Sequence, residues 1–315
     1  GQRGRGMIAN QVALIKREVW EHRSIWITPA AVAFVVTFIA IAMVIMAAAF
    51  GEAVNPEIEK LADATLPEAV RRAALAVLLV GNTSVFLMAM WFLMIFYCLD
   101  SLYAERKDKS ILFWRSLPIT DAETVVSKLL TAIVAIPIAT MAAVIVSHLL
   151  NLVIMSVWLA SAGANPFRFI WGAVPLFDTW AAVFIYLLAV PIWFAPLLGW
   201  FLFISAWAKR GPLLRAALPI AILPILEYIV FRSWNLGLAI VDRLRFEAMP
   251  IFDISEFASR FDEDDLHSML EQDISLISVL DVGKFVTSGE VWAGLVVCGL
   301  FVTAAIYVRR YRDES

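Results

Sequence analysis

Long apolar stretches constrain the fold of this chain more than any other feature of its sequence. Runs of about 20 apolar residues recur along it, and a helix of that length crosses the bilayer core, which is about 30 Å thick. Apolar residues make up 62% of the 315 positions and charged residues only 17%, which does not describe a soluble domain. We therefore predict an all-α, polytopic membrane protein.

Six transmembrane helices are predicted, at residues 27–50, 73–99, 129–159, 179–207, 213–231 and 291–308. They divide the chain into an interfacial helix at 7–26, five spans at 27–231 with a cytoplasmic loop at 100–128, an external helical segment at 232–290, and a sixth span with a cytoplasmic tail at 291–315. The stretch at 7–26 carries charges on one side and apolar residues on the other, which is typical of a helix lying in the membrane interface. A plain cytosolic extension of the first span is the alternative.

The distribution of lysine and arginine predicts the orientation. Basic residues are concentrated before the first span, after the second, after the fourth (Lys209 and Arg210) and after the sixth (Arg309, Arg310 and Arg312). The intervening loops have fewer basic residues or are dominated by acids. Because basic loops stay on the cytoplasmic side, both termini are expected to be cytoplasmic. Cys98 and Cys298 fall inside spans, so no external disulfide framework is expected.

The loop between the second and third spans, Tyr103 to Lys128, mixes charges with large apolar residues. Its basic residues flank the apolar run Ile111 to Trp114, and Pro118 follows. Thr120 and Glu123 then form a capping box that predicts a helix running to about Ser156, longer than the bilayer needs. The loop should therefore sit on a helical stalk and dock on another protein. Positive-inside anchoring and interfacial contact by the aromatic residues are the alternatives.

Polar residues inside spans are costly, so they are candidates for a substrate path. Asn82 interrupts the second span, and His148 and Asn151 share one face of the third. Glu227 follows two prolines in the fifth span. The alternative is that the first three bond neighbouring helices and that Glu227 reaches Arg232.

Two prolines, Pro191 and Pro196, bracket Trp193 and Phe194 in the fourth span. Kinks there could let the helix bend during gating. Proline is common in membrane spans, however, so we expect simple curvature.

No catalytic motif is present in the sequence. Val282-Gly283-Lys284-Phe285 lacks the upstream glycine and the hydroxyl residue of a phosphate-binding loop. The three histidines lie in separate segments, so no metal site is expected. The net charge of −3 suggests no nucleic-acid partner. The chain is therefore not expected to be an enzyme by itself or to bind a cofactor.

The string Glu105-Arg-Lys-Asp-Lys-Ser-Ile-Leu-Phe-Trp-Arg-Ser-Leu-Pro118 resembles the segment E-R-[RK]-D-x-S-[IL]-x-F-[WY]-[KR]-S-L-P of ABC-2 (type-2) permeases. These are the transmembrane subunits of ATP-binding-cassette exporters. The layout of spans resembles the same family over essentially the whole chain. The resemblance implies a permease subunit that forms the translocation path in the bacterial cytoplasmic (inner) membrane, with the lipid bilayer around it.

The family also implies partners. They are a second permease copy, in a homodimer or a pair with a related chain, and a separate ATPase subunit that binds ATP and Mg. The ATPase-coupling helix would lie between spans two and three and include Glu105, Arg106, Lys107, Asp108, Lys109, Ser110, Ile111, Leu112, Phe113, Trp114, Arg115, Leu117 and Pro118. An ATP-independent transporter or a membrane scaffold is the alternative function.

Overall fold

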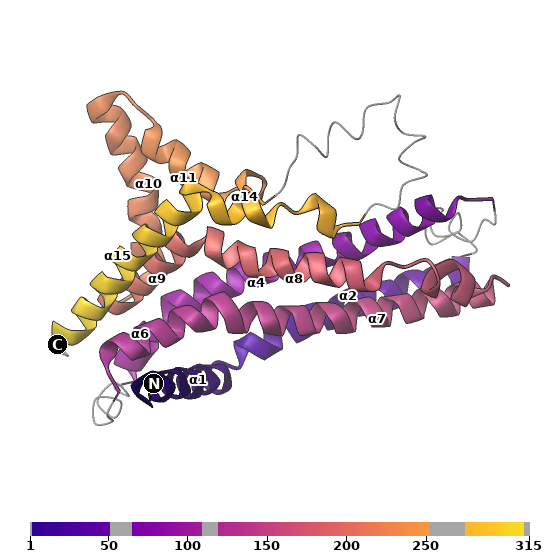
Figure 1. Ribbon diagram of the computed structural model, residues 1–315, viewed down its shortest axis with the longest axis horizontal. Helices are drawn as coiled ribbons and strands as arrows, with labels where there is room; N and C mark the ends of the chain where they lie inside the picture. The colour runs from indigo at the N-terminus through magenta and orange to yellow at the C-terminus, as the bar shows by residue number, and fades with distance from the viewer. Residues whose placement is uncertain (1, 51–64, 109–118, 252–274, 312–315) are drawn as a thin grey trace.

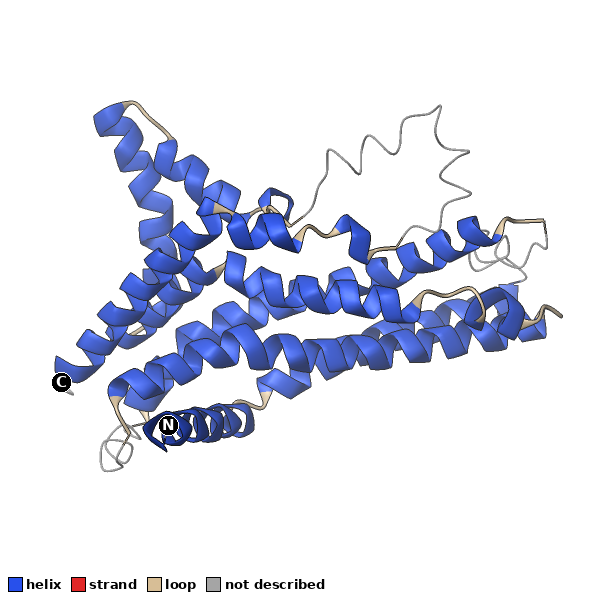
Figure 2. Ribbon diagram, viewed as in Figure 1, coloured by secondary structure: helices blue, strands red, loops and turns tan. Residues whose placement is uncertain are grey.

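A computed structural model describes residues 2–50, 65–108, 119–251 and 275–311, and the elements within them are helices (Figure 2). The α-helices are α1 (Gln2–Glu21), α2 (Ser24–Phe50), α4 (Glu68–Lys107), α6 (Asp121–Leu130), α7 (Ile136–Ser161), α8 (Leu176–Trp193), α9 (Ala195–Trp207), α10 (Pro212–Phe231), α11 (Asn235–Leu244), α14 (Val282–Thr287) and α15 (Gly289–Tyr311). Two π-helical turns, η1 (Thr131–Ala135) and η2 (Phe167–Trp171), and two 3-10 turns, η3 (Phe246–Ala248) and η4 (Ile277–Val279), complete the set.

Six helices in the described part of the chain are long and apolar enough to cross a bilayer. They are Ser24–Met46, Glu68–Lys107, Asp121–Ser161, Leu176–Trp193, Pro212–Phe231 and Gly289–Tyr311. The predicted class, an all-α protein with six membrane-crossing helices, is thereby confirmed.

Two helices are longer than a bilayer requires, as the sequence predicts. α4 has 40 residues, and the continuous helix from α6 through η1 to α7 has 41. At 1.5 Å per residue each is about 60 Å long, roughly twice the bilayer core. The predicted capping box is present, because the Glu123 N–H donates to Thr120 Oγ1 and the Thr120 N–H donates to Glu123 Oε2 at 2.8 Å. The two helices therefore form a stalk beneath the loop that joins them.

The fourth span is interrupted, which corrects the expectation of simple curvature. α8 ends at Trp193, Phe194 adopts φ −81° and ψ 3°, and α9 begins at Ala195. Pro196 has no N–H to donate to the carbonyl four residues earlier, so the helical hydrogen bonding breaks at this point. The span is thus a long helix followed by a shorter apolar one.

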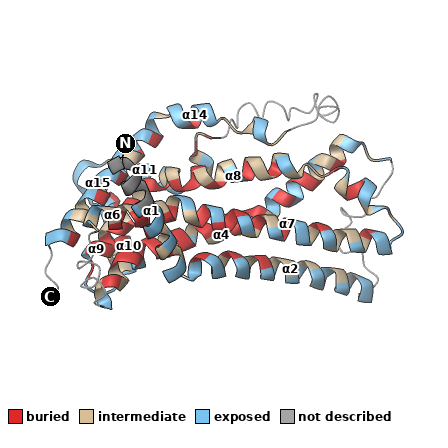
Figure 3. Cartoon of the chain, turned by 60° about the horizontal axis from the view of Figure 1, so that its bottom comes forward, coloured by how far each residue is buried: buried red, intermediate tan, exposed pale blue. Residues whose placement is uncertain are grey.

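Helices α2, α4, α7 and α8 run side by side along the long axis of the molecule (Figure 1). Buried residues are concentrated in α4, α7, α8 and α9, whereas α2 is largely exposed (Figure 3). α10 is also exposed along most of its apolar length. Apolar side chains exposed on such helices are suited to lipid or to another subunit. Cys98 of α4 and Cys298 of α15 are buried free thiols.

The chain ends and the stalk meet at one end of the bundle, where α1, the base of α6 and the C-terminal end of α15 pack together (Figure 1). Between α10 and α15, the described residues contain α11, η3, η4 and α14. Of the external helical segment predicted at 232–290, residues 252–274 lie outside the described residues.

Candidate coupling and translocation sites

A buried lysine lies at the centre of the stalk. Lys128 of α6 is 1% exposed, and its ammonium group lies 3.0 Å from both carboxylate oxygens of Glu18 in α1. The same ammonium lies 2.9 Å from Glu105 Oε1, near the end of α4. Tyr97 of α4 adds a hydrogen bond by donating to Glu18 Oε2 at 3.0 Å. One cation therefore joins three helices.

The last helix belongs to the same network. Arg309 of α15 donates to Glu105 Oε2 at 2.6 Å and, through Nε, to Asp121 Oδ1 at 2.9 Å. Glu105 stands two residues before the end of α4, and Asp121 is the first residue of α6. The two ends of the connecting loop are thus tied to each other through a guanidinium group of α15.

Arg17 contacts both Glu18 and Glu105, so with it the network holds three cations and three carboxylates, and its charges balance as their burial requires. Burial raises the pKa of Glu18, but the nearby Lys128, the hydrogen bond with His22 and the charge of Arg17 lower it more, so the pKa lies well below its ordinary range. Glu18 is consequently ionised at neutral pH. A buried ion pair is weakly stabilising at best, but removing one partner leaves an uncompensated charge. The network therefore favours one relative placement of four helices.

Only the start of the predicted coupling segment lies within the described residues. Glu105 belongs to the buried network, and Arg106 donates to the carbonyl oxygens of Ser205 and Ala208 at 2.5 and 2.8 Å. Lys107 and Asp108 are exposed at the end of α4. The other predicted coupling residues lie outside the described residues: Lys109, Ser110, Ile111, Leu112, Phe113, Trp114, Arg115, Leu117 and Pro118.

The structure brings together three of the four residues predicted to line a path. His148 is fully buried, and its Nδ1 accepts a hydrogen bond from Trp180 Nε1 at 3.2 Å. Its Nε2 lies 3.2 Å from Thr83 Oγ1, whose hydroxyl donates to the carbonyl of Leu79. The neutral ring therefore carries its proton on Nε2 and donates to Thr83. Both ring nitrogens are satisfied by neighbouring helices.

The two asparagines are linked by a serine. Asn151 Nδ2 donates to Ser147 Oγ at 3.2 Å and to the Ser147 carbonyl at 2.7 Å. Ser147 Oγ in turn donates to Asn82 Oδ1 at 3.3 Å. This short relay crosses from α7 to α4 at the same level as His148.

Glu227 lies elsewhere, in the last turns of α10, close to the turn between α10 and α11, which projects away from α7 (Figure 1). Its carboxylate accepts from the Ser233 hydroxyl at 2.9 Å and from the Leu236 N–H at 2.8 Å. Arg232, which is the C-cap of α10, has a positive φ of 54°. Glu227 therefore holds the chain reversal and the start of α11.

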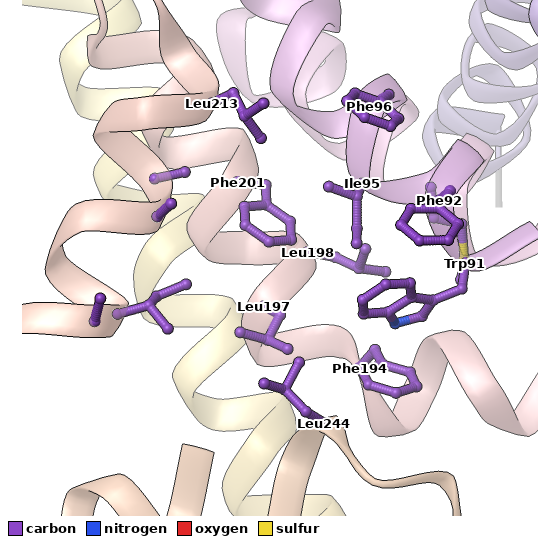
Figure 4. Close-up of a pocket in the computed structure, with 15 residues that line it drawn as sticks. Trp91, Phe92, Ile95, Phe96, Phe194, Leu197, Leu198, Phe201, Leu213 and Leu244 are labelled. Carbon is purple, nitrogen blue, oxygen red and sulfur yellow. The ribbon is translucent and has the colours of Figure 1, made fainter. Parts of the chain in front are cut away.

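A separate apolar cavity of about 330 Å³ lies between α4, α9 and α10. Phe92, Ile95 and Phe96 of α4 face it from one side, and Phe201 and Leu213 face it from the other (Figure 4). A second cavity of about 600 Å³ shares Phe92, Phe96 and Leu213 with it. Polar side chains of His22, Ser24, Thr28 and Asp100 line that second cavity, toward the end of the bundle that holds the stalk.

A comparison with protein families identifies the chain. A model described as "ABC-2 family transporter protein" matches residues 72–234, which is just over half of the 315 positions. The chain belongs to the ABC-2 transporter family. No curated protein and no solved structure matches it.

The ABC-2 family membrane domain makes this chain a permease component of an ABC transporter, a multi-pass membrane protein that is not itself catalytic. The family implies an ATP-binding subunit as partner. The match includes α4, α6, α7, α8, α9 and α10, and with them the stalk, the polar relay and the helices around the apolar cavity.

Sequence reasoning missed two ion pairs in this ABC-2 permease, Lys128 with Glu18 and Arg309 with Glu105. Lys128 and Arg309 count toward cytoplasmic charge in the sequence, and nothing there shows that they meet carboxylates 110 and 204 residues away. Their charge inside or beside otherwise apolar helices was the one available signal.

Proposed function

We propose that this chain is the permease subunit of an ATP-binding-cassette exporter, working as a homodimer with a separate ATPase subunit in the bacterial cytoplasmic membrane. ATP and Mg bind to that partner, and residues 109–118 dock on it. The chain supplies the substrate path and the levers that open it. Family membership supports the permease role, and the match of residues 105–118 to the coupling-segment pattern supports the docking role.

The single observation that carries the coupling proposal is the buried charge network. A force on the loop reaches Glu105 at one end and Asp121 at the other, and both carboxylates are bonded to Arg309. Glu105 also meets Lys128, which bonds Glu18. Because packed, hydrogen-bonded interfaces switch between discrete arrangements rather than deforming gradually, loop movement would shift α1 and α15 together with the stalk.

The proposed path has two supports of different kinds. Polar side chains within membrane spans mark substrate routes, and Asn82, His148 and Asn151 gather between α4 and α7. The apolar cavity between α4, α9 and α10 adjoins the more polar one beside Asp100, which offers an entry from the stalk end. Glu227 was predicted to line the path. We propose instead that it fixes the turn between α10 and α11, next to the helices around the apolar cavity.

Co-purification tests the docking role. The permease is co-expressed with a phosphate-loop ATPase subunit from its gene neighbourhood, and the complex is captured through a tag on the permease. Phe113→Asp and Trp114→Asp should each abolish ATPase recovery, because a charge in an apolar hot spot removes most of the binding energy. Phe177→Asp is the matched control, since Phe177 is an exposed aromatic at the start of α8, at the other end of the bundle.

Insertion and folding of each variant are verified by gel filtration in detergent. Full ATPase recovery with both Asp variants would refute the docking assignment. Failure of any phosphate-loop ATPase to co-purify with the unmodified permease would favour the ATP-independent alternative.

A further inference from the structure

A third cavity, of about 210 Å³, lies between α2, α4 and α7, apart from the cavities beside α10. Its wall is apolar except for two side chains, Asn82 of α4 and Asn151 of α7. Met43 and Leu78 on its rim are 44% and 40% exposed, so the cavity opens on the outer surface of the bundle. It is an apolar pocket with two convergent polar groups, which is the usual form of a small-molecule site.

The relay through Ser147 fixes what these two amides can offer. The amide nitrogen of Asn151 and the amide oxygen of Asn82 are both used in bonds to Ser147. Among the described residues, no hydrogen-bond partner is found for Asn82 Nδ2 or Asn151 Oδ1. The site therefore presents the amide NH2 group of Asn82 as donor and the amide oxygen of Asn151 as acceptor to its contents.

The depth of the site makes these two groups consequential. Asn82 lies ten residues beyond Arg72 and Asn151 ten residues before Ser161, so each is about 15 Å inside the end of its apolar stretch. At that depth in a bilayer, amide groups lack the water that satisfies them elsewhere. A molecule that bonds both amides gains from each, whereas an alkyl chain leaves both unsatisfied.

We propose that this cavity binds an uncharged amphiphile through a hydroxyl or amide group, which accepts from Asn82 Nδ2 and donates to Asn151 Oδ1. Its lining carries no charged side chain, so an ionic head group would lose its hydration without gaining a counter-charge. A cavity of about 150 Å³ holds a benzene ring. The space therefore takes the polar group with one ring or a short alkyl segment, and the rest of the molecule extends past Met43 and Leu78 into the lipid.

The inference rests on the proposed function in one respect, because it assigns a ligand class to the polar relay that we place beside the translocation path. Binding to the permease itself needs neither the ATPase nor turnover. A binding assay on the permease alone therefore separates the two proposals.

The test uses photolabelling of the full-length permease in lipid nanodiscs. The probes are a dodecanol with a diazirine in its alkyl chain, the matching diazirine dodecane without the hydroxyl, and the matching dodecylammonium. Labelled peptides are mapped by mass spectrometry. Asn82→Leu and Asn151→Leu keep approximate side-chain volume and remove the polar atoms. Ser84→Ala is the control. Ser84 is two residues from Asn82, but its hydroxyl donates to the carbonyl of Gly81 and it does not line the cavity.

We expect the alcohol probe to label α4 and α7 around the cavity, and each Asn variant to reduce this labelling roughly tenfold, as loss of one hydrogen bond predicts. Ser84→Ala should leave it unchanged, and the alkane and ammonium probes should label weakly in every variant. Competition by dioleoylglycerol would identify a membrane lipid as the source, and competition by octanol alone would identify a smaller compound.

Equal labelling by alcohol and alkane probes, insensitive to both Asn variants, would overturn the proposal and leave an ordinary lipid-filled groove. If an Asn variant misfolds, labelling of the unmodified protein by the alcohol over the alkane still decides the matter. Neither result changes the expected outcome of the co-purification test, because that test concerns docking of residues 109–118 on the ATPase and not this cavity.

Discussion

Lys128 is a charged side chain buried where three helices of this permease meet. Its ammonium is 1% exposed and serves carboxylates from two helices, Glu18 in α1 and Glu105 in α4. Desolvating a lysine costs several kcal/mol, and the interaction offsets that cost only where counter-charges lie at hydrogen-bond distance. The arrangement is therefore specific as well as stabilising, because moving any one of the three helices exposes an unpaired charge to an apolar interior.

The first prediction concerns this lysine. Lys128→Met keeps the length of the side chain and removes the ammonium group shared by two buried carboxylates, which leaves the network with an excess negative charge, so it should cost about 3–5 kcal/mol. That corresponds to a fall in melting temperature on the order of 10 °C for the detergent-solubilised permease. Lys107→Met is the matched control, since Lys107 is exposed at the end of α4. A melting temperature for Lys128→Met equal to that of the control would show that the network contributes nothing.

Packing between α9 and α15 governs how the interrupted fourth span joins the sixth. A Cβ placed on Gly199 would lie 3.0 Å from the carbonyl oxygen of Cys298 and 3.1 Å from its Cα. Backbones come this close only where one side chain is absent, which is the usual device for helix contact within membranes. Pro196 breaks the helix at the start of α9, and Gly199 then lets the shorter helix lie against α15.

The second prediction follows from that contact. Gly199→Ala should destabilise the permease by about 1–3 kcal/mol, because the added methyl meets backbone that cannot yield. Gly299→Ala adds the same methyl to α15, where nothing lies within 4 Å, and should be neutral or slightly stabilising because alanine favours a helix. Thermal unfolding of the two variants side by side checks the difference. Equal melting temperatures would mean that α9 and α15 adjust to the added methyl group of Gly199→Ala without loss of stability, and would contradict a close contact at Gly199.

At the scale of the whole molecule, the described elements that we propose to receive the ATPase lie at one end. α1, the end of α15 and both ends of the connecting loop meet there, while the turn before α8 lies at the other end (Figure 1). A six-span chain brings both termini to the same side. The lysine and arginine distribution predicts that this side is cytoplasmic.

The third prediction tests this orientation. Green fluorescent protein fused after residue 315 should fluoresce, and alkaline phosphatase inserted within residues 252–274 should be active, because the former matures in the cytoplasm and the latter outside it. Exchanging the two reporters should silence both. An active phosphatase at the C-terminus would reverse the proposed topology and remove the loop from reach of any cytoplasmic ATPase.

The sequence by itself determined the fold class, the six spans, the overlong stalk helices and the capping box at Thr120. These features depend on hydrophobic length and on bonds between near neighbours, which a linear pattern records. It also singled out Asn82, His148 and Asn151, because polar residues stand out in apolar spans. It did not foresee the break at Phe194 as a full interruption, since proline in a membrane helix can equally well produce curvature.

Only the tertiary structure decided which of these polar side chains have hydrogen-bonding groups without a partner among the described residues. His148 is satisfied at both ring nitrogens, and Glu227 holds a chain reversal, whereas Asn82 and Asn151 each keep one group facing a cavity. It also decided that Lys128 and Arg309 hold carboxylates from distant parts of the chain. Such pairings depend on how helices are placed in space, and helices of similar apolar composition can pack in many ways that the sequence pattern alone does not distinguish.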